Sequence, residues 1–115
     1  FQRVVETVRE VIFETDADGR WTYLNPAWTR LLGHDVAASL GTVFLEFVHP
    51  DDRAGNVEKF APLVRREKEF CRHEVRYRAA DGTYRWIEVH AQLLPDPADP
   101  TVALGTTGTL RDVTA

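Results

Sequence analysis

Sulfur is nearly missing from this sequence, which has no methionine and a single cysteine, Cys71. One thiol cannot form a disulfide within the chain, so the fold does not depend on oxidation and suits a reducing compartment. Long apolar runs are also missing: none reaches the roughly 18 residues of a membrane-spanning helix, and no signal peptide is visible. We therefore expect a cytoplasmic segment without membrane contact. The missing start methionine leads us to expect a segment of a longer protein.

Positive charge is not in excess either. The 14 Lys and Arg residues face 18 Asp and Glu residues, which gives a formal charge of -4. Nucleic-acid binding needs a concentrated positive field to neutralise phosphates, so we expect no nucleic-acid partner. Several arginines do lie close together in the sequence, but Glu74 and Glu88 are interleaved with them, which favours a solvated strand face over a basic binding strip. These arginines are Arg72, Arg76, Arg78 and Arg85.

The rest of the composition is that of an ordinary globular protein. The 115 residues are 43% hydrophobic and 28% charged, which fits one domain with one core. A chain of this size buries about two-thirds of its unfolded surface, which leaves room for at most one small enclosed cavity. We expect a single domain over residues 1–115.

The first third of the chain predicts a helix followed by a β-hairpin. Apolar residues recur at helical spacing over residues 1–10, in a pattern formed by Val4, Val5 and Val8. Residues 11–14 and 21–24 have strand character. Residues 16–19 (DADG) between them are typical of a tight turn, because Gly19 tolerates a positive φ.

The middle of the chain predicts short helices and one longer helix. Asn25 and Pro26 are suited to begin a helix, with Asn25 as a cap, and Gly33 is suited to end it. Residues 34–48 favour one or two helical turns. A longer helix is expected from Pro50 to about Glu67, with Pro62 predicting a kink or an early end. Its inward residues are expected to be Val57, Phe60, Ala61 and Val64.

From residue 70 onward the hydrophobic period changes to two. Residues 70–78, 84–94 and 101–113 therefore predict three antiparallel strands with one covered face and one wetter face. A turn is expected at Asp81-Gly82. Gly105 and Gly108 suggest a bulge or a close backbone contact in the last strand. Together with the helices, this pattern predicts an α+β fold with helices on one face of a sheet.

Four stretches in this order resemble the PAS domain family. They are DADGRWTYLNPAWTRLLG (16–33), HPDDR (49–53), EVRYRAADGTYRWIEV (74–89) and GTLRDVT (108–114). The likeness is greatest to the PAS subclass that has an HPDD element and an Arg-Trp pair after the hairpin turn, here Arg85-Trp86. The resemblance implies a five-stranded antiparallel sheet in the order 2-1-5-4-3, with short helices on one face.

The resemblance also implies a role in signalling. PAS domains usually precede an output domain of the same polypeptide, such as a histidine kinase of a two-component system or a diguanylate cyclase. The segment Asp112-Val113-Thr114 is similar to the family's exit motif, where the signal leaves the domain. The N-terminal helix, with Val4, Val5 and Val8, is similar to a helix that often mediates dimerisation, so we expect a homodimer.

The residues that would hold a known PAS cofactor are missing. Flavin-binding relatives carry a reactive cysteine in the middle helical region, and residues 44–60 have none. Haem-binding relatives carry a histidine in the long helix, and residues 51–67 have none. The histidines are scattered without the spacing of metal ligands, and we expect His49 to help cap a helix and His73 to lie in the core. We predict no flavin, haem or metal. The histidines are His34, His49, His73 and His90.

No catalytic residue is predicted. Asp51 and Asp52 are explained by the start of a helix, where the helix dipole favours negative charge. Glu74 and Glu88 are explained by pairing with arginines across strands. No nucleophile elbow, phosphate loop or metal motif is present. A small independent α+β enzyme remains as a distant alternative; otherwise, catalysis belongs to a kinase or cyclase domain of the parent protein.

The covered face of the sheet has two interpretations. A filled core is favoured, because many large side chains point into a small volume. The alternative is a sensor that binds a small apolar or carboxylated metabolite in the core. The residues expected to line that pocket are Leu32, Phe44, Phe47, Val48, Phe60, His73, Val75, Tyr77, Val89, Ala91, Leu104 and Thr106.

Two tryptophans are candidates for a contact surface. Trp21 and Trp86 are expected to point outward from their strands, where they would either join a partner surface or pack against the N-terminal helix. Our main hypothesis is a PAS module that relays a signal through dimerisation to an output domain, by a movement of the strand that ends at Asp112-Val113-Thr114.

Overall fold

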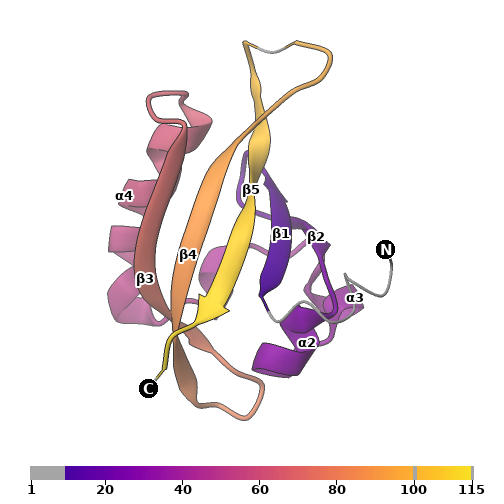
Figure 1. Cartoon of the computed structure of the whole chain (residues 1–115), viewed down its shortest axis with the longest axis vertical. Coiled ribbons are helices and arrows are strands. Elements are labelled where there is room, and N and C mark those ends of the chain that lie inside the picture. Colours follow the sequence, from indigo (N-terminus) through magenta and orange to yellow (C-terminus); the bar gives the residue numbers. More distant parts are fainter. Residues whose placement is uncertain (1–9, 100, 115) are drawn as a thin grey trace.

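The computed structural model of the chain describes residues 10–99 and 101–114 (Figure 1). The predicted helix over residues 1–10, with Val4, Val5 and Val8, lies outside the described residues apart from Glu10. The described chain forms one five-stranded antiparallel sheet in the order β2-β1-β5-β4-β3, which confirms the expected topology. The strands are β1 (Val11–Asp16), β2 (Trp21–Leu24), β3 (Phe70–Arg78), β4 (Tyr84–Pro95) and β5 (Ala103–Asp112).

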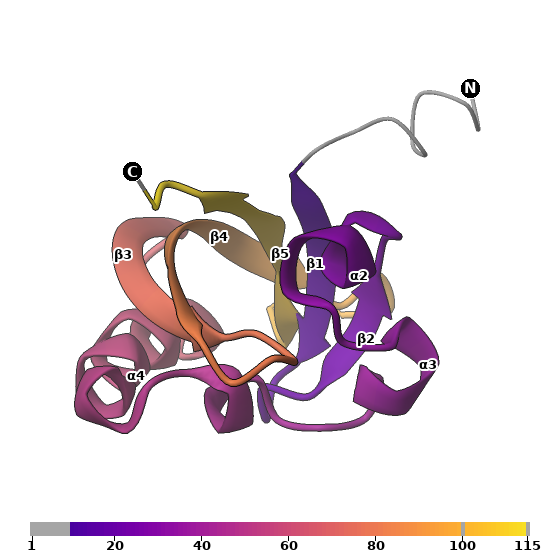
Figure 2. The ribbon, with the colours of Figure 1, turned by 90° about the horizontal axis from the view of Figure 1, so that it is seen from below.

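The helices between β2 and β3 gather on one side of the curved sheet (Figure 2). They are α2 (Ala27–Leu32), α3 (Val36–Ser39), the 3-10 turn η1 (Phe44–Phe47) and α4 (Pro50–Val64). Between the helices and the sheet lies an apolar core in which Trp28, Leu63 and Ile87 are fully buried. The expected short helical turns between residues 34 and 48 are therefore confirmed as α3 and η1.

The β1–β2 hairpin has the predicted turn but an unexpected bulge. Gly19 adopts the left-handed conformation (φ 86°), and the Asp16 carboxylate accepts hydrogen bonds from the backbone N–H groups of Asp18 and Arg20 at 2.9 Å each. Beyond this turn, Thr15 pairs with Trp21 while Glu14 pairs with Tyr23. The register therefore shifts by one residue at Thr22.

This bulge overturns the expectation that Trp21 points outward. In a regular strand, Trp21 and Leu24 would face opposite sides of the sheet, because side chains alternate. The additional residue in the bulge turns both of them inward. Trp21 is only 2% exposed, and its ring contacts those of Phe13, Trp28 and Phe44. Trp21 is therefore part of the core and not of a contact surface.

Asn25 also has a different role from the one expected. Its side chain does not cap α2. Instead, its Oδ1 accepts a hydrogen bond from the Ile12 N–H at 3.0 Å, and its Nδ2 donates to the Glu10 carbonyl at 3.1 Å. The side chain is fully buried and fastens the start of α2 to β1. At the other end of α2, Gly33 ends the helix in the left-handed conformation, as expected.

The long helix α4 begins as predicted and ends early. His49 Nδ1 accepts a hydrogen bond from the Asp51 N–H at 3.0 Å, which confirms His49 as a capping residue. The helix ends at Val64, two residues after Pro62, and not near Glu67. Its buried residues are Asn56 and Leu63, whereas Val57 is 41% exposed, so the expected inward position of Val57 is wrong.

Both outer edges of the sheet are partly occupied by other groups of the same chain. Along β2, the Trp21 N–H donates to the Thr42 carbonyl at 3.0 Å, and the Trp21 carbonyl accepts from the Gly41 N–H at 2.9 Å. Along β3, the Arg76 carbonyl accepts from the His49 N–H at 2.8 Å, and the Arg76 N–H donates to the Asp52 carboxylate at 2.9 Å. These bonds satisfy backbone groups that an edge strand otherwise leaves open.

Candidate functional site

Most of the residues expected to line a pocket do face the core. Phe60 and His73 are only partly buried, while the others, except Leu104, are buried. Leu104 is 44% exposed, so its expected position in the core is wrong. It lies near the tip of the β4–β5 hairpin, which projects beyond the helices (Figure 1). Side chains still alternate between the two faces there, but no helix covers the inner face, so both faces are exposed. The buried residues are Leu32, Phe44, Phe47, Val48, Val75, Tyr77, Val89, Ala91 and Thr106.

A small cavity of about 30 Å³ lies within this core. Two of its polar groups are hydroxyls from neighbouring strands, Thr15 of β1 and Thr106 of β5, whose Oγ1 atoms lie 2.7 Å apart. A third is the fully buried phenol of Tyr77, whose pKa is raised by burial. The volume is far below the roughly 300–1,000 Å³ of pockets that enclose drug-sized ligands. The cavity is lined by Phe13, Thr15, Trp21, Phe44, Phe60, Tyr77, Val89, Ala91 and Thr106.

The sequence interpretation missed three of these lining residues. Phe13 and Thr15 lie at alternate positions of β1 and so face the same side of the sheet. The alternation of that strand could have identified both as inward-facing. Trp21 had no such signal, because its inward position depends on the bulge at Thr22. Thr15 joins the site only because β1 pairs with β5, where Thr106 is its direct neighbour in the register.

A polar pair lies between α4 and β3 at the side of the core. His73 Nε2 and Asn56 Oδ1 are 3.0 Å apart, so the histidine donates to the amide oxygen. Burial, together with the nearby Lys59, lowers the pKa of His73 to about 4. The neighbouring Cys71 thiol has a raised pKa, also because of burial. His73 is therefore neutral near pH 7, but it lies partly buried at the side of the core and not inside it as expected.

This environment predicts a pH-dependent stability. His73 has an ordinary pKa of 6.5 when unfolded and about 4 when folded, so the folded state resists protonation as the pH falls below 6.5. Between pH 7 and pH 5 we expect the free energy of unfolding to fall by about 1 kcal/mol from this residue, allowing for its partial exposure. Urea unfolding at both pH values should show this loss for the wild type and a smaller loss for His73→Gln; equal losses would contradict it.

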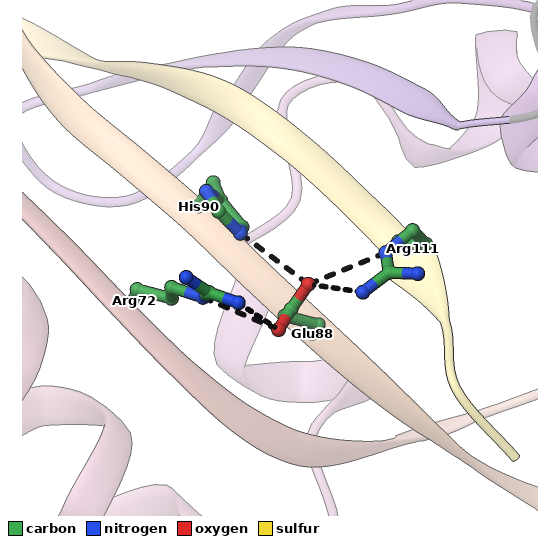
Figure 3. A network of polar contacts seen from close by, with 4 residues as sticks. All are labelled: Arg72, Glu88, His90 and Arg111. Atoms are coloured by element: carbon green, nitrogen blue, oxygen red, sulfur yellow. Dashed lines mark hydrogen bonds and ion pairs between the residues drawn. The ribbon is translucent and has the colours of Figure 1, made fainter.

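On the outer face of the sheet, Glu88 is surrounded by positive groups (Figure 3). Its Oε1 accepts from Arg111 at 2.7 Å and lies 3.3 Å from His90 Nε2, while its Oε2 accepts from Arg72 at 3.2 Å. The hydrogen bond with Arg111, and then that with Arg72, lowers the pKa of Glu88 to about 2. This network confirms that Glu88 is explained by pairing across strands. It joins β3, β4 and β5 on the face away from the helices.

The predicted exit residues come together at the end of β5. The Asp112 carboxylate accepts from Arg85 at 3.1 Å and from the Thr114 N–H at 2.8 Å. The Thr114 hydroxyl in turn accepts from the Trp86 N–H at 2.8 Å, and the Val113 N–H donates to the Trp86 carbonyl at 2.8 Å. The backbone that leaves the sheet is thus held against β4 at Trp86.

Trp86 is also connected to α4 through Arg76. The Arg76 guanidinium lies 5.2 Å from the centre of the Trp86 ring and donates to both carboxylate oxygens of Asp52, at 2.8 and 3.0 Å. The hydrogen bond with Arg76 lowers the pKa of Asp52. Trp86 itself is 44% exposed, so it points outward as expected. The pairing of Asp52 with Arg76 joins residues far apart in the sequence, and no local spacing indicates it.

None of the helices in residues 10–99 and 101–114 has the length and apolar character to span a bilayer. Within the same residues, no three His, Cys, Asp or Glu side chains gather in a way that could hold a metal ion.

The chain resembles known proteins along nearly its whole length. The family model described as the PAS fold matches residues 1–113. Sporulation kinase C of Bacillus subtilis is 27% identical over 112 residues, which cover 97% of this chain and 25% of the relative. The chain spans a quarter or less of the length of each of the four curated relatives it matches.

Solved structures show the same arrangement. The PAS domain of a protein from Colwellia psychrerythraea has a TM-score of 0.84 at 21% identity, with 98% of this chain and 93% of that one covered. The sensory box histidine kinase/response regulator from Burkholderia thailandensis has a TM-score of 0.73 at 26% identity, with 99% and 84% covered.

Proposed function

The chain belongs to the PAS family, and we propose that this sensor domain relays a signal to a histidine kinase domain of the same polypeptide. The kinase output is supported by the likeness to sporulation kinase C and to the sensory box histidine kinase/response regulator. A cyclic-dinucleotide enzyme is the alternative output. The proposal places the domain in the cytoplasm, where ATP is available to a kinase. It acts there as a homodimer whose contact includes the exposed Trp86.

The observation that carries this proposal is the way β5 joins the core to the exit. Thr106 of β5 lines the core cavity, and the same strand ends at Asp112, which is bound to Arg85 and to the Thr114 N–H. A strand is stiff along its length, so a shift near Thr106 moves the exit backbone. Relay requires two arrangements that an input favours differently, and the bonds at Trp86 are the contacts that such a shift would make or break.

Substitution of the exit carboxylate tests the relay. In the full-length protein, we expect Asp112→Asn to change the rate of autophosphorylation from ATP about 5-fold or more, because the exit loses its charged contact with Arg85. The matched control is Asp18→Asn, which alters an exposed ion pair with Arg20 in the β1–β2 turn and should leave the rate unchanged.

A second exit variant guards against loss of folding. Thr114→Val removes only the hydroxyl that accepts from the Trp86 N–H. Both exit variants should keep the melting temperature within a few degrees of the wild type, since these residues lie at the end of the strand. Wild-type kinase rates in both folded variants would refute the relay through this exit.

Ligand sensing in the core is the second candidate function. It is favoured by the core cavity, whose wall carries the paired hydroxyls of Thr15 on β1 and Thr106 on β5 in otherwise apolar surroundings. Pockets of this kind use a few polar groups to orient a ligand. Such a ligand would act on the same strand β5 that leads to the exit.

A further inference from the structure

Exposed apolar side chains gather at the end of the domain opposite the exit. Phe70 is 69% exposed and Val102 is 47% exposed, the two highest values among the large apolar side chains of residues 10–99 and 101–114, and Leu104 follows at 44%. Phe70 opens β3, while Val102 and Leu104 belong to the β4–β5 hairpin at the top of Figure 1, and β5 ends at the opposite, lower side. Exposed apolar residues that cluster in this way often mark a contact between proteins.

The α4–β3 loop (residues 65–69) is the basic part of this end, with three cations against two carboxylates. Arg65 is paired with Glu67 at 3.5 Å, whereas Arg66 and Lys68 form no ion pair within the residues that the structure describes. Arg66 has a φ of 62°, the only positive φ of a non-glycine residue in that part of the chain. It follows the C-cap of α4, a position where glycine adopts this conformation without strain. Strain of this kind indicates a role for the side chain outside the fold.

The β4–β5 loop (residues 96–102) is the acidic part, since it contains Asp96 and Asp99 and no Lys or Arg. Among the described residues, each of these carboxylates accepts hydrogen bonds through Oδ1 alone. The two loops are neighbours: the hydrogen bonds from Thr101 lower the pKa of Asp99, and the charge of Arg66 adds to this effect. A hollow between them is lined by Arg66, Glu69, Phe70, Gln92, Leu93 and Pro95.

Opposite charges side by side make this end of the domain self-complementary. A partner with one sign of charge would leave one of the two loops without a counter-charge. A second copy of the chain, related by a two-fold axis, presents both signs in the matching order. We propose that a second copy covers this end, with the α4–β3 loop of each copy against the β4–β5 loop of the other. The same contact removes Phe70, Val102 and Leu104 from water.

This contact goes beyond the proposed function, because it lies at the opposite end of the domain from Trp86 and the exit. It consists of two short loops and three apolar side chains per copy, which is small beside the roughly 800 Å² per partner of a stable interface. We therefore expect a dissociation constant on the order of 0.1 mM. The association should strengthen at low salt, because salt screens exposed charges.

The test is sedimentation velocity of two charge-reversal variants of the full 115-residue chain, alone and mixed. Lys68→Glu sets negative charge against the acidic loop, and Asp96→Lys sets positive charge against the basic loop. Each variant alone should associate at least about fivefold more weakly than the wild type. An equimolar mixture should regain the wild-type association, because the mixed pair brings the two reversed charges together. All other contacts, including any at Trp86, are the same in these samples.

Two results would overturn the proposal. Single variants that sediment like the wild type would show that these charges do not meet in a contact. A mixture that sediments no faster than its separate components would exclude the two-fold arrangement and would leave this end to a different partner. A restored mixture also shows that both variants are folded.

Two further variants test the apolar part and the strained arginine. Leu104→Ser should weaken association at least about fivefold, whereas the matched Leu40→Ser, at a leucine of 40% exposure after α3, should leave it unchanged. Arg66→Gly should raise the melting temperature, because the strain is relieved, and should weaken association. Equal association of both leucine variants, or an unchanged association of Arg66→Gly, would contradict the contact. The relay is tested separately, by the kinase rates of the exit variants.

Discussion

Replacement of Gly108 by alanine is expected to destabilise the domain by more than about 3 kcal/mol. A Cβ atom at this position would lie 1.8 Å from the carbonyl oxygen of His90 on the neighbouring strand. Backbone cannot move aside as the end of a side chain can, so the β4–β5 pairing itself must open. Gly105 meets the same limit, with the carbonyl oxygen of Thr15 at 1.8 Å, and these distances confirm the predicted close contact in β5.

The matched control for this prediction is another Gly→Ala change, which we expect to increase stability. Gly55 lies within α4, and a Cβ there would meet nothing within 4 Å. Alanine has the better helix propensity, so Gly55→Ala should raise stability by about 0.5–1 kcal/mol. Urea unfolding followed by tryptophan fluorescence measures both variants. A Gly108→Ala protein as stable as the wild type would contradict the close β4–β5 pairing at this position.

The second large effect is a difference in stability between alanine variants of Trp21 and Trp86. Trp21→Ala should cost about 3–5 kcal/mol, because it removes a buried ring that contacts three other aromatic rings. Trp86→Ala should cost less than about 1 kcal/mol, since the ring is 44% exposed and lies against the Arg76 guanidinium at the surface. The expected effect of Trp86→Ala is instead a weaker self-association of the full 115-residue chain.

Sedimentation velocity measures that association. If Trp86 belongs to the proposed dimer contact, Trp86→Ala shifts the protein toward the monomer at concentrations where the wild type is dimeric. Tyr23→Ala is a suitable control, because Tyr23 is an exposed aromatic residue of β2 at 41% and lies away from the exit. An unchanged sedimentation profile for Trp86→Ala would remove Trp86 from the interface.

The strands and their order were predictable because the signals for them are local or belong to the family pattern. A hydrophobic period of two identifies a strand within a few residues, and Gly19, Gly33 and Gly82 occupy the left-handed turns for which glycine is favoured. Asp112 and Thr114 lie at the end of the last strand, where the family pattern places them, and they bind groups of their own strand end and of β4; their role as the exit stays a prediction. These features can therefore be predicted without knowing how distant parts of the chain pack.

The errors have in common a dependence on distant parts of the chain. The bulge at Thr22 reversed the orientation of Trp21, and no residue in that stretch signals it. Val57 was expected on the inward face of α4 because it is apolar. The buried residue is instead its neighbour Asn56, whose amide pairs with His73 of β3. A polar side chain can be buried when it forms a hydrogen bond there. For Asn56 the partner is His73, 17 positions away in the sequence, so the local pattern does not indicate it.

The occupied edges of the sheet have a consequence for solubility. An open edge strand is a template on which another chain can add a strand, and repeated addition leads to amyloid-like aggregates. Residues 41–42 block this route along β2, and His49 and Asp52 block it at Arg76 of β3. The first half of β3 then becomes the place where aggregation would begin, and it opens with Phe70 at 69% exposure. Arg72 and Glu74, which follow on the same stretch, act there as charged gatekeepers against the stacking of chains.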